Sequence, residues 1–161
     1  MSITFRPTGP DDEPFLLEVY ASTRSQEMAA VPWSDAQREA FLKMQYIAQR
    51  QHYRSHFPEA DYLIILSDDR PVGRLYVDRS KAKILIIDIT LLYAERNKGS
   101  GTAIIRDLMN EAANAVKPLH IHVESFNPSL RLFERLGFHR VVEDNGDGVY
   151  LLMEWNNGAS S

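Results

Sequence analysis

A short stretch in the second half of the chain has the composition of a phosphate-binding loop. Its two glycines let a phosphate approach the backbone, its arginine and lysine supply positive charge, and its hydroxyls are further donors. An apolar helical pattern follows at once, so first-turn amides without partners inside the helix would face the same anion. The predicted loop residues are Arg96, Asn97, Lys98, Gly99, Ser100, Gly101 and Thr102.

The spacing of these residues excludes two common nucleotide-binding loops. A Walker loop needs a glycine, four residues and then Gly-Lys-Ser or Gly-Lys-Thr, and this order is absent here. The Gly-x-Gly-x-x-Gly pattern of a dinucleotide fold is also missing, as is the acidic residue expected after the next strand. The loop therefore predicts a phosphorylated ligand of another kind.

The elements beside the loop are those that would position it. A nearly continuous apolar run at residues 83–92 precedes it and predicts a strand covered on both faces. After it, Ile104, Ile105, Leu108 and Ala112 recur at helical spacing up to Pro118. A buried strand that enters a glycine-rich turn and then a helix places the loop at the positive end of the helix dipole.

The remaining elements complete one domain. Strands are expected at about 3–6, 62–66, 72–77, 119–123, 138–143 and 148–155, and helices at about 11–24, 34–56 and 129–136. Ser34 and Gln37 have the spacing of a capping box at the start of the long helix. We predict a single α/β domain at 1–155 and a flexible tail at 156–161. Its sheet would be mixed, mostly antiparallel and six- to seven-stranded, flanked by about four helices.

The composition limits the compartments and partners. The net charge of −4 offers no broad cationic field for a nucleic acid, and no apolar run is long enough to cross a bilayer. With no cysteine, disulfides and a cysteine nucleophile are excluded. We therefore expect a cytoplasmic protein without nucleic-acid or membrane partners.

Two motifs together resemble one family. The pattern Arg-x-x-Gly-x-Gly at 96–101 is similar to motif A of the GNAT N-acetyltransferase superfamily. Downstream, residues 127–138 (Asn-Pro-Ser-Leu-Arg-Leu-Phe-Glu-Arg-Leu-Gly-Phe) resemble that family's second signature. The resemblance implies a GNAT-like acyl-CoA N-acyltransferase fold. It also implies acetyl-CoA as co-substrate, with its pyrophosphate on the loop.

The resemblance also implies roles for residues outside the loop. The backbone around Leu91 and Leu92 would pair with the pantetheine arm and polarise the acetyl carbonyl, and Asn127 would contact that arm. Phe133 stands where the family often has a tyrosine near the thiolate, and phenylalanine has no proton to give. Leu85 stands where an acidic residue is frequent.

Candidate bases must remove a proton from an ammonium before it attacks. We expect Asp88 or Glu124 in this role, with a water chain or Tyr93 as alternatives. A capped or salt-bridged carboxylate, or an outward one on an edge, is the simpler interpretation of Asp88. His120 and His122 alternate on one strand face, where they would line the sheet or shuttle a proton.

Other side chains leave further alternatives open. The pair His52 and His56 on the long helix lacks an acidic or cysteine third ligand, so no metal site is predicted. The aromatic residues Trp33, Tyr46, Tyr53 and Phe57 would form either an acceptor-pocket wall or core packing.

The predicted function is direct acetyl transfer from acetyl-CoA to a primary amine of a small molecule or peptide. The rival is a non-catalytic acyl-CoA-binding or regulatory module, which is kept open by Phe133 and by Leu85 in place of the frequent acidic residue. A structural interaction domain without a ligand is a third alternative. The acceptor, the preferred acyl-CoA and a homodimeric state are left open by the sequence.

Overall fold

The computed structural model describes residues 2–124, 129–141 and 150–157. The strands are β1 (Ile3–Pro7), β2 (Asp61–Ser67), β3 (Arg70–Asp78), β4 (Ile84–Leu91), β5 (Leu119–Glu124), β6 (His139–Val141) and β7 (Tyr150–Trp155). The helices are α1 (Glu13–Ser22), α2 (Ser25–Ala29), α3 (Asp35–His56), α4 (Ser100–Ala115) and α5 (Leu130–Arg135). Two 3-10 turns are η1 (Pro10–Asp12) and η2 (Tyr93–Glu95).

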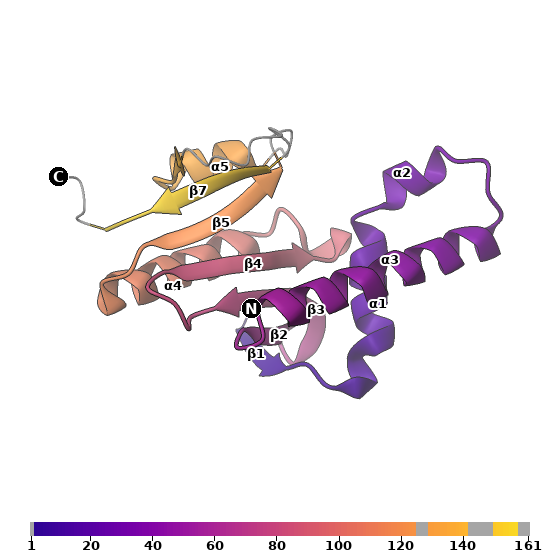
Figure 1. The fold of residues 1–161 in the computed structure, drawn as a ribbon, viewed down its shortest axis with the longest axis horizontal. Helices are drawn as coiled ribbons and strands as arrows, with labels where there is room; N and C mark the ends of the chain where they lie inside the picture. The colour runs from indigo at the N-terminus through magenta and orange to yellow at the C-terminus, as the bar shows by residue number, and fades with distance from the viewer. Residues whose placement is uncertain (1, 125–128, 142–149, 158–161) are drawn as a thin grey trace.

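All the strands belong to one sheet, in the order β1-β2-β3-β4-β5-β7-β6 (Figure 1). Every neighbouring pair is antiparallel except β4 and β5, which are parallel because α4 connects them as a crossover. The predicted mixed, mostly antiparallel sheet is confirmed, at the upper end of the expected strand number.

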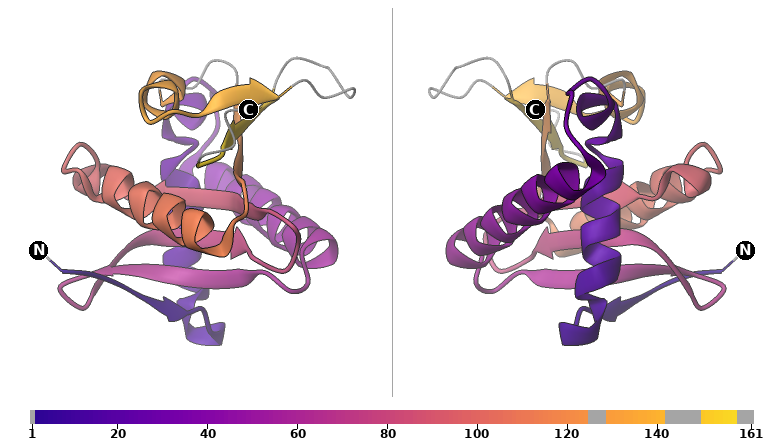
Figure 2. Two further views of the ribbon diagram at one scale, coloured as in Figure 1. Left: turned by 90° about the vertical axis from the view of Figure 1, so that its left-hand side faces the viewer. Right: turned by 90° about the vertical axis from the view of Figure 1, so that its right-hand side faces the viewer.

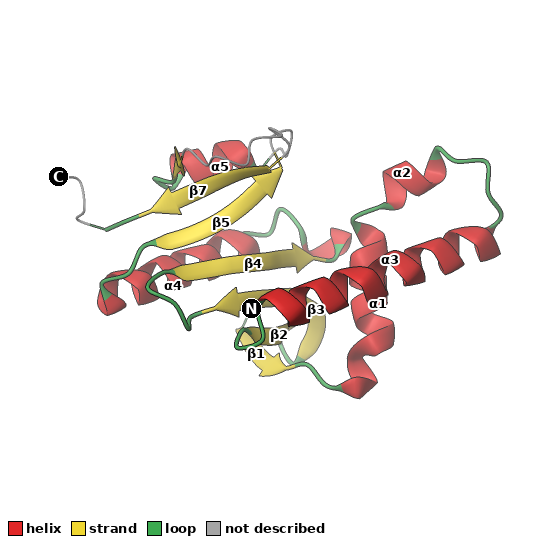
Figure 3. Ribbon diagram, viewed as in Figure 1, coloured by secondary structure: helices red, strands yellow, loops and turns green. Residues whose placement is uncertain are grey.

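Helices cover both faces of the sheet. Helices α4 and α5 lie on one face and α1 and α3 on the other (Figures 2 and 3). The main core lies between α4 and the sheet, where Ile86, Ile104 and Ile121 are buried together. A smaller cluster that includes Leu16, Tyr46 and Ile64 packs α1 and α3 on the other face. In Figure 1 the front of β4, β5 and β7 carries no helix.

The central parallel pair opens into a fork. Pairing of β4 with β5 begins at Ile84 and Leu119 and ends at Ile86 and Ile121. Directly afterwards Ile87 is an extra residue in the ladder with β3, which is a β-bulge. Because a bulge bends its strand, the second half of β4 diverges from β5 and leaves one β4 edge unpaired.

Some element boundaries differ from the sequence expectation. The short helix α2 was not predicted, because its five residues are too few to display a helical period. The long helix α3 begins as predicted: Ser34 accepts a hydrogen bond from the Gln37 amide, at 3.2 Å, and donates its own amide to the Gln37 side chain, at 2.8 Å. Strand β6 is described only over three residues, and residues 142–149 lie outside the described part. No helix in the described part of the chain is long and apolar enough to span a bilayer.

Candidate functional site

The predicted phosphate loop lies between the end of β4 and the first turn of α4. Asn97 and Gly99 have positive φ angles of 62° and 85°, which turn the chain sharply into the helix. Asparagine and glycine are residues that tolerate this conformation, which explains their place in the loop. The Ala103 amide donates to the Gly99 carbonyl at 3.0 Å, so the amides of residues 100–102 precede the first helical bond and are available to an anion.

The cations of the loop are held by two neighbouring groups. The Arg96 Nε donates to the Leu91 carbonyl oxygen at 3.0 Å, which folds this side chain back over the end of β4. The Lys98 ammonium lies 3.8 Å from the carboxylate of Glu95. Glu95 is only 4% exposed and also accepts a hydrogen bond from Arg70 at 3.0 Å. Glu95 therefore ties the loop to the β2–β3 hairpin, a role that sequence reasoning missed.

This tether leads to a prediction for Glu95→Gln. We expect the variant to lose about 1–3 kcal/mol of unfolding free energy, because the buried carboxylate that accepts the Arg70 hydrogen bond is replaced by a neutral amide. Urea unfolding measures this loss. The substitution Glu27→Gln is the control, since Glu27 pairs with Arg24 at an exposed site and should change stability little. Equal effects at the two positions would contradict the tethering role of Glu95.

The unpaired edge of β4 faces the gap of the fork. The Leu92 amide donates to the Val72 carbonyl at 2.9 Å, so Leu92 and every second residue before it direct their backbone groups to β3. Ile89 and Leu91 alternate with these and direct their backbone groups toward the gap. A Cβ added to Gly101 would touch Leu91 Cδ1 at 3.7 Å, which places the loop directly beside this edge. The Leu92 amide itself is engaged within the sheet.

Asp88 lies on the α1/α3 face of β4 and is held in an ion pair. Its carboxylate accepts hydrogen bonds from Arg74 at 2.8 and 3.3 Å, from Tyr53 Oη at 3.1 Å and from Thr90 Oγ1 at 2.7 Å. Arg74 is 2% exposed and also donates to Gln49 at 3.0 Å. Four donated bonds occupy the lone pairs of this carboxylate, so its geometry favours holding over proton transfer.

The groups around Asp88 keep their protons. Burial, followed by the charge of Asp88, raises the pKa of Tyr53 far above its usual range. Burial works against the charge of Arg74, but the attraction of Asp88 prevails and raises the pKa of this guanidinium. Arg74 therefore stays charged and the Tyr53 phenol stays protonated across the ordinary pH range. The sequence did contain one signal for this ion pair. Arg74 is a charged residue inside the predicted strand 72–77, where it needs a partner of opposite charge.

The structure does not test the predicted roles of three further site residues. Glu124 is the last residue of β5, paired with Tyr150, and its side chain lies outside the described part. Asn127 also lies outside the described residues. Phe133 is 5% exposed and meets Phe138 edge-on with ring centroids 5.5 Å apart, so it belongs to the core. Their roles toward a cofactor or substrate stay predictions.

A groove of about 520 Å³ lies on the open front of β4, β5 and β7. Phe57, Leu85 and Pro118 form its apolar walls. His120 Nε2 lies 2.7 Å from a carboxylate oxygen of Glu154, which is hydrogen-bond distance. The groove lies over the paired start of β4 and β5, where Leu85 and His120 are partners in the ladder.

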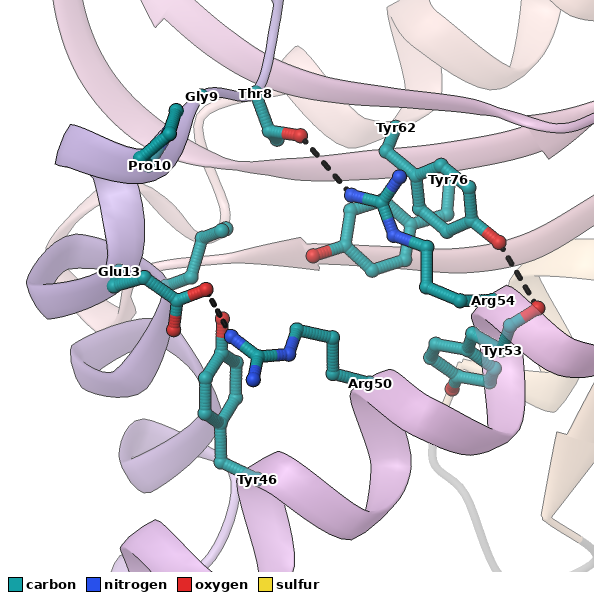
Figure 4. A pocket seen from close by; sticks show the side chains of 11 residues that line it. Thr8, Gly9, Pro10, Glu13, Tyr46, Arg50, Tyr53, Arg54, Tyr62 and Tyr76 are labelled. Atoms are coloured by element: carbon teal, nitrogen blue, oxygen red, sulfur yellow. Dashed lines mark hydrogen bonds and ion pairs between the residues drawn. The ribbon is translucent and has the colours of Figure 1, made fainter. Parts of the chain in front are cut away.

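A second cavity, of about 380 Å³, lies between α1, α3 and the first strands (Figure 4). Tyr46, Tyr53, Arg50 and Arg54 reach it from α3, and the ion pair of Arg50 with Glu13 borders it (Figure 4). Burial, and then the nearby charge of Glu13, raise the pKa of Tyr46 to about 12. The predicted aromatic wall is thus divided between two cavities. Tyr46 and Tyr53 line this one, Phe57 lines the groove, and Trp33 packs on Phe41 instead.

The histidine pair on α3 forms no metal cluster within the described residues. The rings of His52 and His56 are 4.1 Å apart, and His56 Nδ1 lies 2.9 Å from the His52 carbonyl oxygen. No group of three or more potential ligands gathers around an ion site in the described part of the chain.

Comparisons with known proteins agree with this geometry. Among solved structures, the PaiA N-acetyltransferase from Thermoplasma acidophilum, in complex with coenzyme A, has 17% identity and a TM-score of 0.67, over 97% of this chain and 99% of that chain. An acetyltransferase from Thermus thermophilus has 15% identity and a TM-score of 0.67, over 97% of each chain. A GNAT family acetyltransferase from Elizabethkingia anophelis with acetyl-CoA bound has 16% identity and a TM-score of 0.60, over 96% of this chain and 97% of that chain. At such identities the likeness shows the fold.

The sequence itself gives the family. No curated protein sequence matches the chain. Residues 21–152, however, match the family model of the acetyltransferase (GNAT) domain, which is most of the 161 residues. The chain, with its fork between β4 and β5 and its glycine loop at the start of α4, therefore belongs to the GNAT acetyltransferase family and is an acyltransferase.

Proposed function

We propose that this protein binds acetyl-CoA and transfers the acetyl group directly to a primary amine of a small molecule or peptide. One observation carries the proposal: the unpaired edge of β4 ends at a loop whose free amides start α4. A ligand with a pyrophosphate at one end and an amide-containing arm at the other matches this arrangement. Acetyl-CoA is such a ligand, and two of the similar solved structures contain coenzyme A or acetyl-CoA.

In this proposal the chain's own groups bind and polarise the donor. The pyrophosphate accepts hydrogen bonds from the amides at residues 100–102, with Arg96 and Lys98 nearby. The pantetheine arm pairs with the backbone groups of Ile89 and the amide of Leu91 as an added strand would, since the Leu91 carbonyl oxygen already accepts a hydrogen bond from Arg96. A backbone amide near Leu91 donates to the thioester carbonyl oxygen and stabilises the negative charge that forms there during attack.

The acceptor approaches from the α1/α3 face, where the front of the fork carries no helix. Its amine must lose a proton before attack, and Glu124 at the open end of β5 is a candidate for this step. Asp88 remains the other sequence candidate, although its four hydrogen bonds favour a positioning role. After attack, the C–S bond breaks and the thiolate takes up a proton to leave as coenzyme A.

Binding of the donor is tested first by thermal unfolding. A ligand that binds only the folded state stabilises it, by about 2.7 kcal/mol at a concentration of 100 times Kd. We therefore expect acetyl-CoA to raise the melting temperature clearly, and a pantetheine acetyl thioester that lacks the pyrophosphate to raise it much less. Equal shifts with the two ligands would contradict the pyrophosphate site.

Catalysis is tested separately by release of free thiol. The protein with acetyl-CoA and a panel of amines, including polyamines, amino sugars and peptides, should release coenzyme A faster with at least one acceptor. Mass spectrometry should find that acceptor heavier by one acetyl group. Tight binding of acetyl-CoA without acceleration by any amine would favour the non-catalytic acyl-CoA-binding module instead.

A further inference from the structure

The cavity between α1, α3 and the first strands has no part in the proposed acetyl transfer. The residues that the structure records around it belong neither to the loop at 96–101 nor to the open part of β4. Its volume of about 380 Å³ lies within the usual range for small-molecule pockets, about 300–1,000 Å³, and near its lower end. A small ligand would therefore fit this cavity, and the lining indicates the chemistry of that ligand.

The floor of the cavity is aromatic and held in place by the fold. The rings of Tyr62 and Tyr76, which we call the aromatic floor, are 8% and 6% exposed and have centroids 4.9 Å apart. Tyr62 Oη lies 2.8 Å from the Phe57 carbonyl oxygen, so this hydroxyl is engaged with the backbone. The floor therefore offers ring surface to a ligand, and we expect a flat apolar body to pack on it.

The charged groups at the cavity do not balance. Arg50 and Arg54 both extend from α3 toward α1 and the residues before it, about one helical turn apart (Figure 4). Among the residues recorded around the cavity, Glu13 is the single carboxylate, and it pairs with Arg50. Like charges at i and i+4 of a helix destabilise each other, so one further negative charge would be favourable here.

The phenols of the lining do not supply that charge. They belong to Tyr46, Tyr53, Tyr62 and Tyr76. Burial raises the pKa of each of these hydroxyls, and for Tyr46 it does so to about 12. All of them stay neutral across the ordinary pH range, so the lining keeps its excess of positive charge.

Arg54 has the geometry to bind an anionic head group. Its guanidinium carbon lies over the Tyr62 ring, 3.8 Å from the ring centroid, which fixes the plane of this group. In the described part of the chain, its recorded side-chain hydrogen bond is a long one, 3.5 Å from Nη2 to Thr8 Oγ1. A guanidinium over a ring keeps N–H donors at its edge, and two of them match two oxygens of a carboxylate or phosphate.

We propose that this cavity binds a small organic anion, with a carboxylate or phosphate group between the guanidiniums of Arg50 and Arg54 and a flat apolar body on the aromatic floor. The inference goes beyond the proposed acetyl transfer and does not depend on it. The anion supplies the missing negative charge, and the ion pair of Arg50 with Glu13 remains beside it. A cationic ligand is disfavoured, because Arg54 already covers the face of Tyr62 and would repel it.

The first test compares probes that share one aromatic ring and differ in head group. Isothermal titration calorimetry at neutral pH measures benzoate and phenyl phosphate, which are anions, against cationic benzylamine and neutral benzyl alcohol. We expect an anion to bind with a dissociation constant of about 1 mM, an affinity that suits about ten heavy atoms, and the other two probes about 10-fold more weakly. The tighter of the two anions identifies the head group. Inorganic phosphate, which lacks the ring, should also bind more weakly than phenyl phosphate.

Matched arginine variants determine where benzoate binds. Arg54→Gln should weaken its binding by about 10- to 100-fold, because charge-assisted hydrogen bonds are lost. Arg54→Lys keeps the charge without the planar fork and should weaken binding less. Arg96→Gln, the same change at the proposed pyrophosphate loop, should leave benzoate binding unchanged. A thermal melt without ligand verifies that each variant is folded.

NMR of the wild-type protein locates the anion without any substitution. Benzoate should shift the backbone amide signals of Gly9 and Tyr62, at the cavity, and leave those of Gly99 and Gly101 unchanged. Benzoate that binds no better than benzylamine would overturn the proposal, as would a loss of affinity in Arg96→Gln in place of Arg54→Gln. No step of this test uses acetyl-CoA, so a protein that acetylates no amine would overturn the proposed function alone.

Discussion

The substitution Gly101→Glu is expected to weaken acetyl-CoA binding by about 100-fold while the protein stays folded. The new carboxylate would stand at the start of α4, beside the site proposed for the pyrophosphate. Two like charges about 4 Å apart near a protein surface repel by several kcal/mol, and about 2.7 kcal/mol is already a factor of 100. Isothermal titration calorimetry measures the affinity, and a thermal melt without ligand verifies the fold.

The fold has room for a side chain at Gly101. A Cβ at Gly101 meets only Leu91 Cδ1, at an ordinary contact distance of 3.7 Å. An acidic side chain in the first turn of a helix is also favourable to the helix dipole. Gly99 is less suitable, since its φ of 85° strains any other residue even though the space around it is open.

Matched substitutions at Gly101 separate charge from bulk. Gly101→Gln has the size of the glutamate variant without its charge, and Gly101→Ala adds only one methyl group. Affinity should fall in the order Ala, Gln, Glu, and the gap between Gln and Glu should narrow at high salt because ions screen the repulsion. If the folded glutamate variant binds acetyl-CoA as tightly as the glutamine variant does, the pyrophosphate is not at this loop.

The substitution Arg74→Met should have the largest effect on stability, a loss of about 3–5 kcal/mol of unfolding free energy. Arg74 is 2% exposed, and its guanidinium provides the only positive charge recorded in contact with Asp88 in the described structure. Without it the carboxylate keeps only the neutral donors Tyr53 and Thr90. Urea unfolding measures the loss.

Two further variants make this result specific. The double variant Arg74→Met, Asp88→Leu should recover much of the loss, because it removes both buried charges together. Arg79→Met is the control, since Arg79 also pairs with two carboxylates but is 35% exposed, and it should cost about 1 kcal/mol or less. A cost for Arg74→Met no larger than for this control would refute the buried-pair assignment for Asp88.

The structure could be predicted from the sequence where a short residue pattern corresponds to one local structure. The loop at 96–101 was predicted to lie between a buried strand and a helix, and it does, because glycine spacing and the following apolar period are local signals. The capping box at Ser34 was predicted for the same reason. The match of both GNAT motifs gave the family, which the family model confirms.

The site could not be predicted from the sequence where it depends on contacts between elements that are distant along the chain. Two of the partners of Asp88, Arg74 and Tyr53, come from β3 and α3, 14 and 35 residues away, and no local pattern pairs them. The tie between Glu95 and Arg70 also bridges separate elements. For His120 the strand alternation predicted the correct face, but its carboxylate partner on β7 is 34 residues further along the chain. Register within the sheet brings that pair together, and register is a tertiary property.

The most direct test of the account is a crystal structure of the protein with acetyl-CoA. We predict pyrophosphate oxygens within hydrogen-bond distance of the amides at residues 100–102, a pantetheine arm along the open edge of β4, and the acetyl group in the fork. A pyrophosphate bound away from the loop, or an acetyl group outside the fork, would contradict the account.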